Sequence, residues 1–295
     1  MIEHELTQHQ IRRGRAETLT VQFYDDGVAV DPGTVTIGIT DDAGAVVVAP
    51  ETATDGSGAD TRSYDLAAQS GLTRLTVTWT SDSYGDFTDS IEVVGEFLFT
   101  IREARTFDGA ALESDTDYPT ADIQETRARI TDAFHHAMAV SHIPRYRRIQ
   151  ITGSGESLLF LPDLYVTTVQ SIEYRDIGDT DWTALDQSDV DAVAILSGGM
   201  IAQGNSQRWQ ANRQYRIAYE HGYATPPLEI KRAALRLLVS YVGATRSSWD
   251  PRATSERTEF GVISLATPGR SGSTFGLPEV DAVIDRYSEH IPGIA

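Results

Sequence analysis

The stretch 215–242 constrains the fold most, because two different hydrophobic periods meet there across a turn. Apolar side chains recur at every second position from Tyr215 to Tyr219, which predicts a half-buried strand. Gly222 marks a turn, and the pair Pro226-Pro227 then predicts the start of a helix, where a missing N–H leaves no bond unmade. The apolar residues of 228–242 predict a helix that is buried over most of its circumference.

The chain before this stretch predicts another helix. It is expected to begin at Thr120 and to end near His142, because the residue before Pro144 is disfavoured in a helix. Arg127 and Arg129 are expected to point outward. The face expected to be buried consists of Ile123, Ile130, Phe134 and Met138.

Short strands and turns are expected between the two helices. Strands are predicted over 145–151, 157–161 and 166–174, with a tight turn at Gly198-Gly199 between two more short strands. The acidic segment 176–181 is expected to form a hairpin loop. The region after Tyr118 is therefore predicted to be helical, with inserted β-hairpins.

The first 105 residues predict a domain made only of strands. Strands separated by Asp- and Gly-containing turns are expected over 18–24, 34–40, 45–49, 74–80, 89–94 and 96–101. This spacing is typical of a small Ig-like β-sandwich, with Trp79 as the main aromatic residue of its core. An acidic linker without periodicity follows over 106–117. The predicted class is α+β, with domains 1–105 and 118–295 on either side of that linker.

Charge is distributed unevenly along the chain. The 295 residues carry a formal net charge of −19, and the first 116 contain 21 acidic against 7 basic residues. Lys231 is the only lysine. An acidic, lysine-poor composition resembles that of proteins from extreme halophiles, although a GC-rich genome also replaces Lys with Arg. Nonspecific binding to nucleic acid is disfavoured, because it requires a basic face.

The sequence contains no recognisable catalytic, cofactor or metal motif. His135-His136 are adjacent on the first helix and lack the spacing of a zinc-binding pair, and Ser154 lacks the GxSxG context. Cysteine is absent, and no stretch approaches the length of a membrane span. We therefore expect no enzyme activity, no cofactor, no metal and no membrane association.

The run Arg145, Arg147 and Arg148 is the densest basic segment. A solvated strand edge, ion pairs between subunits and contact with DNA phosphates are all compatible with it. Trp249, beside Asp250-Pro251, is compatible with an interface anchor. These four residues are our candidates for a subunit interface.

Residues 118–295 resemble the head-tail adaptor, or connector, proteins of long-tailed viruses. The matching features are the helix from Thr120, the strand 158–161 ending at Pro162, Gly198-Gly199, the 219–223 turn and the Pro226-Pro227 helix start. The resemblance implies a twelve-membered ring in the virion neck, assembled in the host cytoplasm and located between portal and tail, with the genome passing through its lumen without specific binding. Composition adds the expectation of a haloarchaeal host.

The resemblance also suggests contact residues. The C-terminal segment would dock on the portal, through Phe275, Leu277, Ile284, Tyr287, Ile291 and Ile294. The hairpin loop would face the tail, through Asp176, Asp179, Asp181 and Trp182.

Other functions stay open from sequence. The β-sandwich could instead bind a host glycan or protein, as in a virion surface or tail-associated recognition protein. The chain could also be another neck protein, such as a stopper or a tail terminator. A carboxylate-dependent hydrolase is the enzymatic alternative, since its acidic pair would be assembled only in space.

Overall fold

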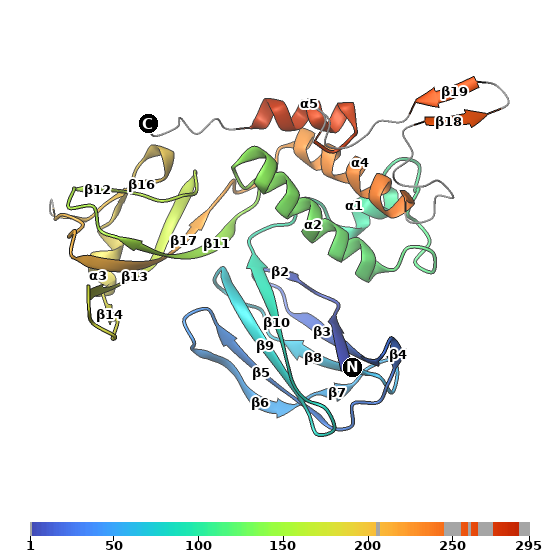
Figure 1. Cartoon of the computed structure of the whole chain (residues 1–295), viewed down its shortest axis with the longest axis horizontal. Coiled ribbons are helices and arrows are strands. Elements are labelled where there is room, and N and C mark those ends of the chain that lie inside the picture. Colours follow the sequence, from blue (N-terminus) through green and yellow to red (C-terminus); the bar gives the residue numbers. More distant parts are fainter. Residues whose placement is uncertain (1, 205–206, 245–254, 259–260, 265–273, 289–295) are drawn as a thin grey trace. The chain divides into compact units, whose positions relative to one another are not determined.

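The computed structural model of the chain contains both helices and β-sheets, which confirms the predicted α+β class (Figure 1). It describes residues 2–204, 207–244, 255–258, 261–264 and 274–288. Contacts divide the chain into two compact units. The first unit comprises Met1–Glu96 and Ile143–Ala224, and the second comprises Phe97–His142 and Thr225–Ala295.

This grouping cuts across the expected domains 1–105, 106–117 and 118–295. The strand Arg145–Thr152 contacts the N-terminal strands Thr73–Ser81 and Gly85–Val94, and 143–224 belongs to the first unit. The expected linker is also folded: Arg105 donates hydrogen bonds to the carbonyls of Leu112 and Ser114, and Leu112 is buried.

The N-terminal part of the first unit consists of two five-stranded sheets. One contains β1 (Ile2–Leu6), β3 (Glu17–Asp25), β4 (Val28–Ala29), β7 (Thr54–Asp55) and β8 (Thr61–Leu66). The other contains β2 (Gln10–Arg12), β5 (Val35–Asp41), β6 (Val46–Thr52), β9 (Thr73–Ser81) and β10 (Gly85–Val94), in the order β2-β10-β9-β5-β6. The pairing of β2 with β10 is parallel.

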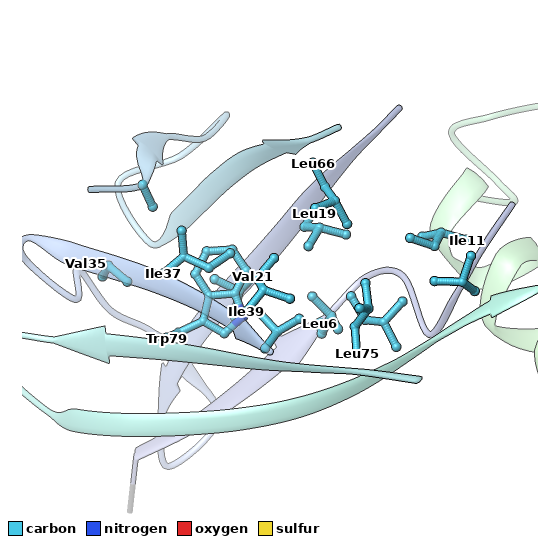
Figure 2. Packing of buried hydrophobic residues seen from close by; sticks show 14 of the residues in the cluster. Leu6, Ile11, Leu19, Val21, Val35, Ile37, Ile39, Leu66, Leu75 and Trp79 are labelled. Atoms are coloured by element: carbon cyan, nitrogen blue, oxygen red, sulfur yellow. The ribbon is translucent and has the colours of Figure 1, made fainter. Parts of the chain in front are cut away.

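One hydrophobic core joins these two sheets (Figure 2). Alternate residues of β9, namely Leu75, Val77 and Trp79, are fully buried in it, as their period predicts. They pack in one cluster with Val21 and Leu66 of the facing sheet. The Ig-like assignment of this two-sheet domain stays a prediction.

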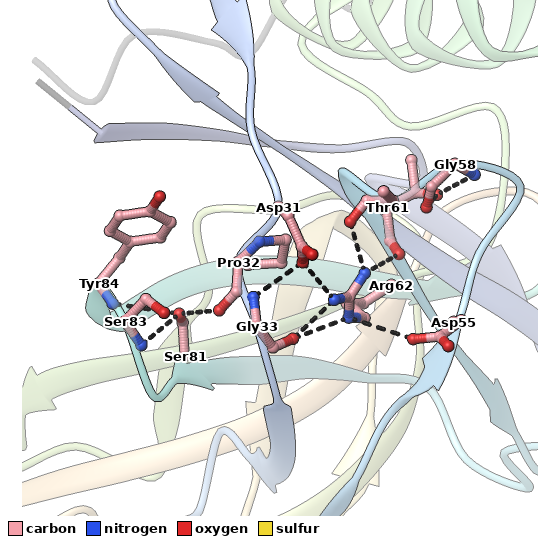
Figure 3. Close-up of polar contacts among 11 residues, drawn as sticks. Asp31, Pro32, Gly33, Asp55, Gly58, Thr61, Arg62, Ser81, Ser83 and Tyr84 are labelled. Carbon is pink, nitrogen blue, oxygen red and sulfur yellow. Dashed lines mark hydrogen bonds and ion pairs between the residues drawn. The ribbon is translucent and has the colours of Figure 1, made fainter.

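A buried arginine, Arg62, forms hydrogen bonds to two loops of this domain, at 31–33 and 59–61 (Figure 3). Arg62 donates hydrogen bonds to the carbonyl of Gly33 at 2.6 Å and to the carboxylate of Asp31 at 2.8 Å. The backbone N–H of Gly33 and the Arg62 guanidinium together lower the pKa of Asp31. Ser81 donates to the carbonyl of Pro32 and accepts bonds from the N–H groups of the next turn. The polar groups of the loop 31–33 are therefore largely engaged in hydrogen bonds.

The rest of the first unit is made of the strands inserted between the helices. A four-stranded sheet has the order β11-β17-β13-β14, from β11 (Arg145–Thr152), β13 (Val166–Asp176), β14 (Thr183–Ala184) and β17 (Arg213–His221). A three-stranded sheet, the small sheet, has the order β12-β16-β15, from β12 (Leu158–Phe160), β15 (Ala194–Ile195) and β16 (Met200–Ala202). The short helix α3 (Gln187–Asp191) lies between β14 and β15, and a 3₁₀ turn (Ser197–Gly199) lies between β15 and β16.

The second unit is helical. It contains α1 (Ile101–Thr106), α2 (Thr120–Met138), α4 (Leu228–Ala244) and α5 (Pro278–Tyr287), together with the hairpin β18 (Ser255–Thr258) and β19 (Gly261–Ser264). Helices α2, α4 and α5 contact one another. The predicted buried residues of α2 are all in the core of this unit. None of the helices in the described ranges is long and apolar enough to cross a membrane.

Two expectations about this unit were wrong. The segment 96–101 is not a strand, because Thr100 caps α1 in a capping box with Glu103. Arg127 points inward and is 3% exposed. Its guanidinium lies 3.4 Å from the centroid of the Phe97 ring and donates to the carbonyl of Phe99, so the cation is stabilised inside the unit.

The buried His142 predicts a pH dependence of stability. Burial, with a smaller effect from His135, lowers the pKa of His142 from 6.5 to about 4. The unfolded chain therefore binds one more proton than the folded chain between these values, and stability falls as the pH drops from 6.5 towards 4. We expect this residue to remove about 2 kcal/mol of unfolding free energy between about pH 7 and about pH 5.

Urea unfolding of the His142→Gln variant at both pH values tests this. The variant should lose less stability on acidification than the parent chain, whereas His9→Gln, at an exposed position, should behave like the parent. Equal losses in the parent and in His142→Gln would contradict the assignment.

Candidate interaction surfaces

The first arginine of β11 is held within its own unit. Arg145 forms a bidentate ion pair with Glu92 of β10, with N–O distances of 2.7 and 2.6 Å. The two side chains are only 12% and 10% exposed, and Gln10 donates a further hydrogen bond to Glu92. Breaking such a shielded pair leaves a charge without compensation, so Arg145 is bound firmly inside the chain.

The second arginine binds a buried carboxylate. Arg147 Nη1 lies 3.0 and 3.1 Å from the two carboxylate oxygens of Asp163, whose side chain is 4% exposed. Tyr219 of β17 donates its hydroxyl to the same carboxylate at 2.5 Å. Burial and this hydrogen bond raise the pKa of Tyr219, so the phenol stays protonated as a donor.

The chain bends at 162–164, and this bend, which contains Asp163 and is called the corner below, depends on a glycine. Gly199 has φ of +73°, and a Cβ atom built there would lie 2.5 Å from the carbonyl oxygen of Asp163. The N–H of Leu161 also donates to the Gly199 carbonyl at 2.8 Å. The Gly198-Gly199 turn predicted from sequence therefore has a structural reason, since only glycine lets the two backbones approach this closely.

The third arginine joins several elements. Arg148 pairs with Glu173 of β13 at 2.5 Å and donates to the carbonyl of Asp42. The neighbouring Tyr146 donates its hydroxyl to the Asp42 carboxylate, and burial followed by the Asp42 charge raises the pKa of this phenol. All three arginines predicted for a subunit interface are thus engaged by carboxylates of their own unit, with Arg147 the most exposed at 45%.

The hairpin predicted to face the tail divides into a fixed base and an exposed tip. At the base, Asp176 pairs with Arg213 at 2.8 Å, and the guanidinium groups of Arg175 and Arg216 stack on the Trp182 ring at 4.5 and 4.0 Å. Trp182 is therefore half-buried between two cations of the same chain.

At the hairpin tip, Asp179 and Asp181 are exposed, and Ile177 is 63% exposed. The accessible part of the predicted tail-side set is therefore the tip, and Ile177 is an exposed apolar residue there that was not among the predicted residues.

The predicted portal-contact residues lie on and around α5. Phe275 and Ile284 are buried in the helical unit, where the Phe275 ring packs edge-on against Phe134 at 5.5 Å. Leu277 and Tyr287 are half-buried and keep accessible surface. The candidates Ile291, Ile294 and Trp249 lie outside the described residues.

A groove of about 430 Å³ lies beside α5 within the helical unit. Phe107, Ala233, Val280 and Val283 contribute apolar lining. Arg236 also lines the groove and forms ion pairs with both Asp108 and Glu279. The charged groups that line the groove are thus largely neutralised by one another.

The apolar outer face of the small sheet was not predicted from the sequence. Phe160 and Leu196 are 54% and 42% exposed there, whereas Leu159 and Ile201 on the opposite face are buried. Strands of two or three residues are too short to show a period, so only the number of apolar residues in 158–161 and 194–202 signalled this surface.

Comparison with known proteins finds similar solved structures at low sequence identity. No protein-family model and no curated protein matches the chain. Two similar solved structures come from gene transfer agent particles: the neck of an empty particle (15% identity, 65% of this chain and 88% of that chain, TM-score 0.42) and the virion of the native particle (15%, 65% and 89%, 0.43). A conjugative transposon lipoprotein from Bacteroides eggerthii is 10% identical over 31% of this chain and 95% of that chain, with a TM-score of 0.21. TM-scores of this size do not establish a shared fold.

Neutralising Asp163 tests the role of the corner that it holds. In Asp163→Asn, Arg147 loses its carboxylate and the Tyr219 hydroxyl loses a charged acceptor, so we expect a loss of roughly 1–3 kcal/mol of unfolding free energy. Chemical denaturation at constant salt measures it. Asp179→Asn, at the exposed hairpin tip, serves as the matched control and should change stability little. Equal stability of both variants would show that the corner does not depend on this carboxylate.

Proposed function

We propose that this protein is a structural component of a virion, without enzyme activity, that assembles into a ring-shaped adaptor between the portal and the tail. The observation that carries the proposal is the order of elements. Helices α2 and α4 contact each other although the strands from β11 to β17 lie between them in the sequence, and α5 packs on α4. This helix, β-insertion and helix order is the one that the resemblance to head-tail adaptors implies.

The path of the insertion supports the same interpretation. Arg145, the first residue of β11, pairs with His221, the last residue of β17. The insertion therefore begins and ends at neighbouring points of one sheet. Its exposed hairpin tip, with Ile177, Asp179 and Asp181, is the part that we assign to the tail-side partner.

The chain end is assigned to the portal. Leu277 and Tyr287 have accessible surface on α5, and the apolar residues Ile291 and Ile294 follow them in the sequence. We propose that this segment docks on the portal protein. Phe275 and Ile284 would support it from the core of the helical unit and would not touch the partner.

The genome is proposed to pass through the lumen without specific binding. A ring of twelve acidic subunits repels DNA phosphates, because each chain carries a formal charge of −19. The three arginines of β11, the densest basic segment, are paired with carboxylates. The same charge and the scarcity of lysine support a haloarchaeal host, whose molar salt would screen the repulsion between subunits.

The two gene transfer agent structures come from the same kind of location, a particle neck or virion. Because both TM-scores are below 0.5, the proposal rests on the features of this chain.

Electron microscopy of the purified chain tests the proposal. In molar salt we expect closed rings with a central lumen, and mass photometry should give one discrete oligomer, twelve copies by our proposal. Antibodies against the chain should label the neck of intact particles. A chain that remains monomeric at all protein concentrations, forms open filaments or labels the tail fibres would contradict the adaptor function.

A further inference from the structure

The outer face of the small sheet is entirely apolar. In β12 and β16, Phe160 pairs with Met200 and Leu158 pairs with Ala202. The third strand continues both rows, since Ala194 pairs with Ala202 and the N–H of Leu196 donates to the Met200 carbonyl. Directly paired residues of antiparallel strands point to the same side. The rows on this side are Phe160, Met200 and Leu196, and Leu158, Ala202 and Ala194.

The opposite face of the small sheet contributes residues to the hydrophobic core of its own unit. Leu159 and Ile201 point inward and are 3% and 0% exposed, in one core cluster with Ile172 and Ile217 of the neighbouring sheet. An antiparallel sheet that is packed on one face is expected to carry polar residues on the other. Here Phe160 is 54% exposed and Leu196 is 42% exposed. The apolar outer rows therefore do not serve the core of the unit.

We infer that the occupant of this face is a second copy of the chain, because the net charge of −19 favours an uncharged face wherever two copies meet. Two chains of net charge −19 repel each other wherever carboxylates meet, and the repulsion persists at short range even in salt. None of the six outward residues is charged. On its own side of such a contact, this face can bury apolar area without desolvating a charge, at roughly 25 cal/mol for each Å².

The size of the face indicates its part in such a contact. Six side chains cover less than the roughly 800 Å² that each partner of a stable interface buries, so this face would be the apolar centre of a larger contact. A groove of about 410 Å³ adjoins it, lined by Ile151, Ser154, Glu156 and Phe160 among others. The groove gives room for a side chain of the neighbouring copy, and its hydroxyl groups and the Glu156 carboxylate suit the polar rim of an interface.

We propose that the outer face of the small sheet, centred on Phe160 and Leu196, is a contact surface between neighbouring copies of this chain. The inference rests on the proposed ring and names the surface that closes it. Because a closed ring of more than two subunits joins unlike patches, the face of one copy meets a different patch of the next.

Thiol shielding tests the inference, because the chain contains no cysteine of its own. In Leu196→Cys, the introduced thiol should react with a maleimide at least ten times more slowly in the assembled ring than in monomers dissociated at low salt. The matched control, Thr180→Cys at the exposed hairpin tip, should react at the same rate in both states.

A charge at the centre of the face gives a second readout. Phe160→Asp should shift the oligomer to monomers in mass photometry while its unfolding midpoint stays near that of the parent, and Ile177→Asp should leave the oligomer intact. Should Phe160→Asp fail to fold, the thiol measurement alone decides.

The outcomes separate this inference from the proposed function. Rings in which the Leu196→Cys thiol reacts as fast as in monomers, and which survive Phe160→Asp, would overturn the contact surface and leave the adaptor proposal standing. A thiol that is protected only in whole particles would assign the face to another neck protein and overturn contact with a second copy. A parent chain that forms no oligomer would overturn both.

Discussion

The pairing of β11 with β17 is the constraint on which the structure depends. Arg145 opposes His221, so the chain enters and leaves the inserted strands at one point. This closure lets α2 and α4, which are far apart in sequence, belong to one helical unit. The buried Asp163 stabilises that closure, since it accepts hydrogen bonds from Arg147 on β11 and Tyr219 on β17.

Buried charged groups of the first unit form ion pairs, whereas the charged groups on the surface are mostly carboxylates. In the first unit, arginines are enclosed by carboxylates: Arg62 by Asp31, Arg145 by Glu92. Such pairs fix geometry more than they add stability, because each ion must be desolvated to form them. Most other carboxylates remain on the surface, where they give the chain its net charge of −19. Contact between copies then requires a surface without charge, and the outer face of the small sheet meets that requirement.

The sequence predicts those elements whose hydrophobic period is long. The stretch 215–242 contains both a two-residue and a helical period, and it folds as the predicted strand and helix. The helix α1 was missed although Thr100 and Glu103 have the spacing of a capping box, a signal that was available. The inward position of Arg127 was not predictable, because it depends on the ring of Phe97, which lies far from it in the sequence. The small sheet was hidden by the shortness of its strands, and the contacts of the β11 arginines depend on pairing across the unit.

We propose that this chain forms a closed ring in the neck of a tailed particle. A cryo-electron microscopy reconstruction of the neck of native particles decides this. We expect a ring of copies directly below the portal, with the helical unit and the inserted sheets recognisable in each copy and the small sheet covered by the neighbouring copy. A neck without this chain, or a chain present as an isolated copy elsewhere on the particle, would rule the ring out.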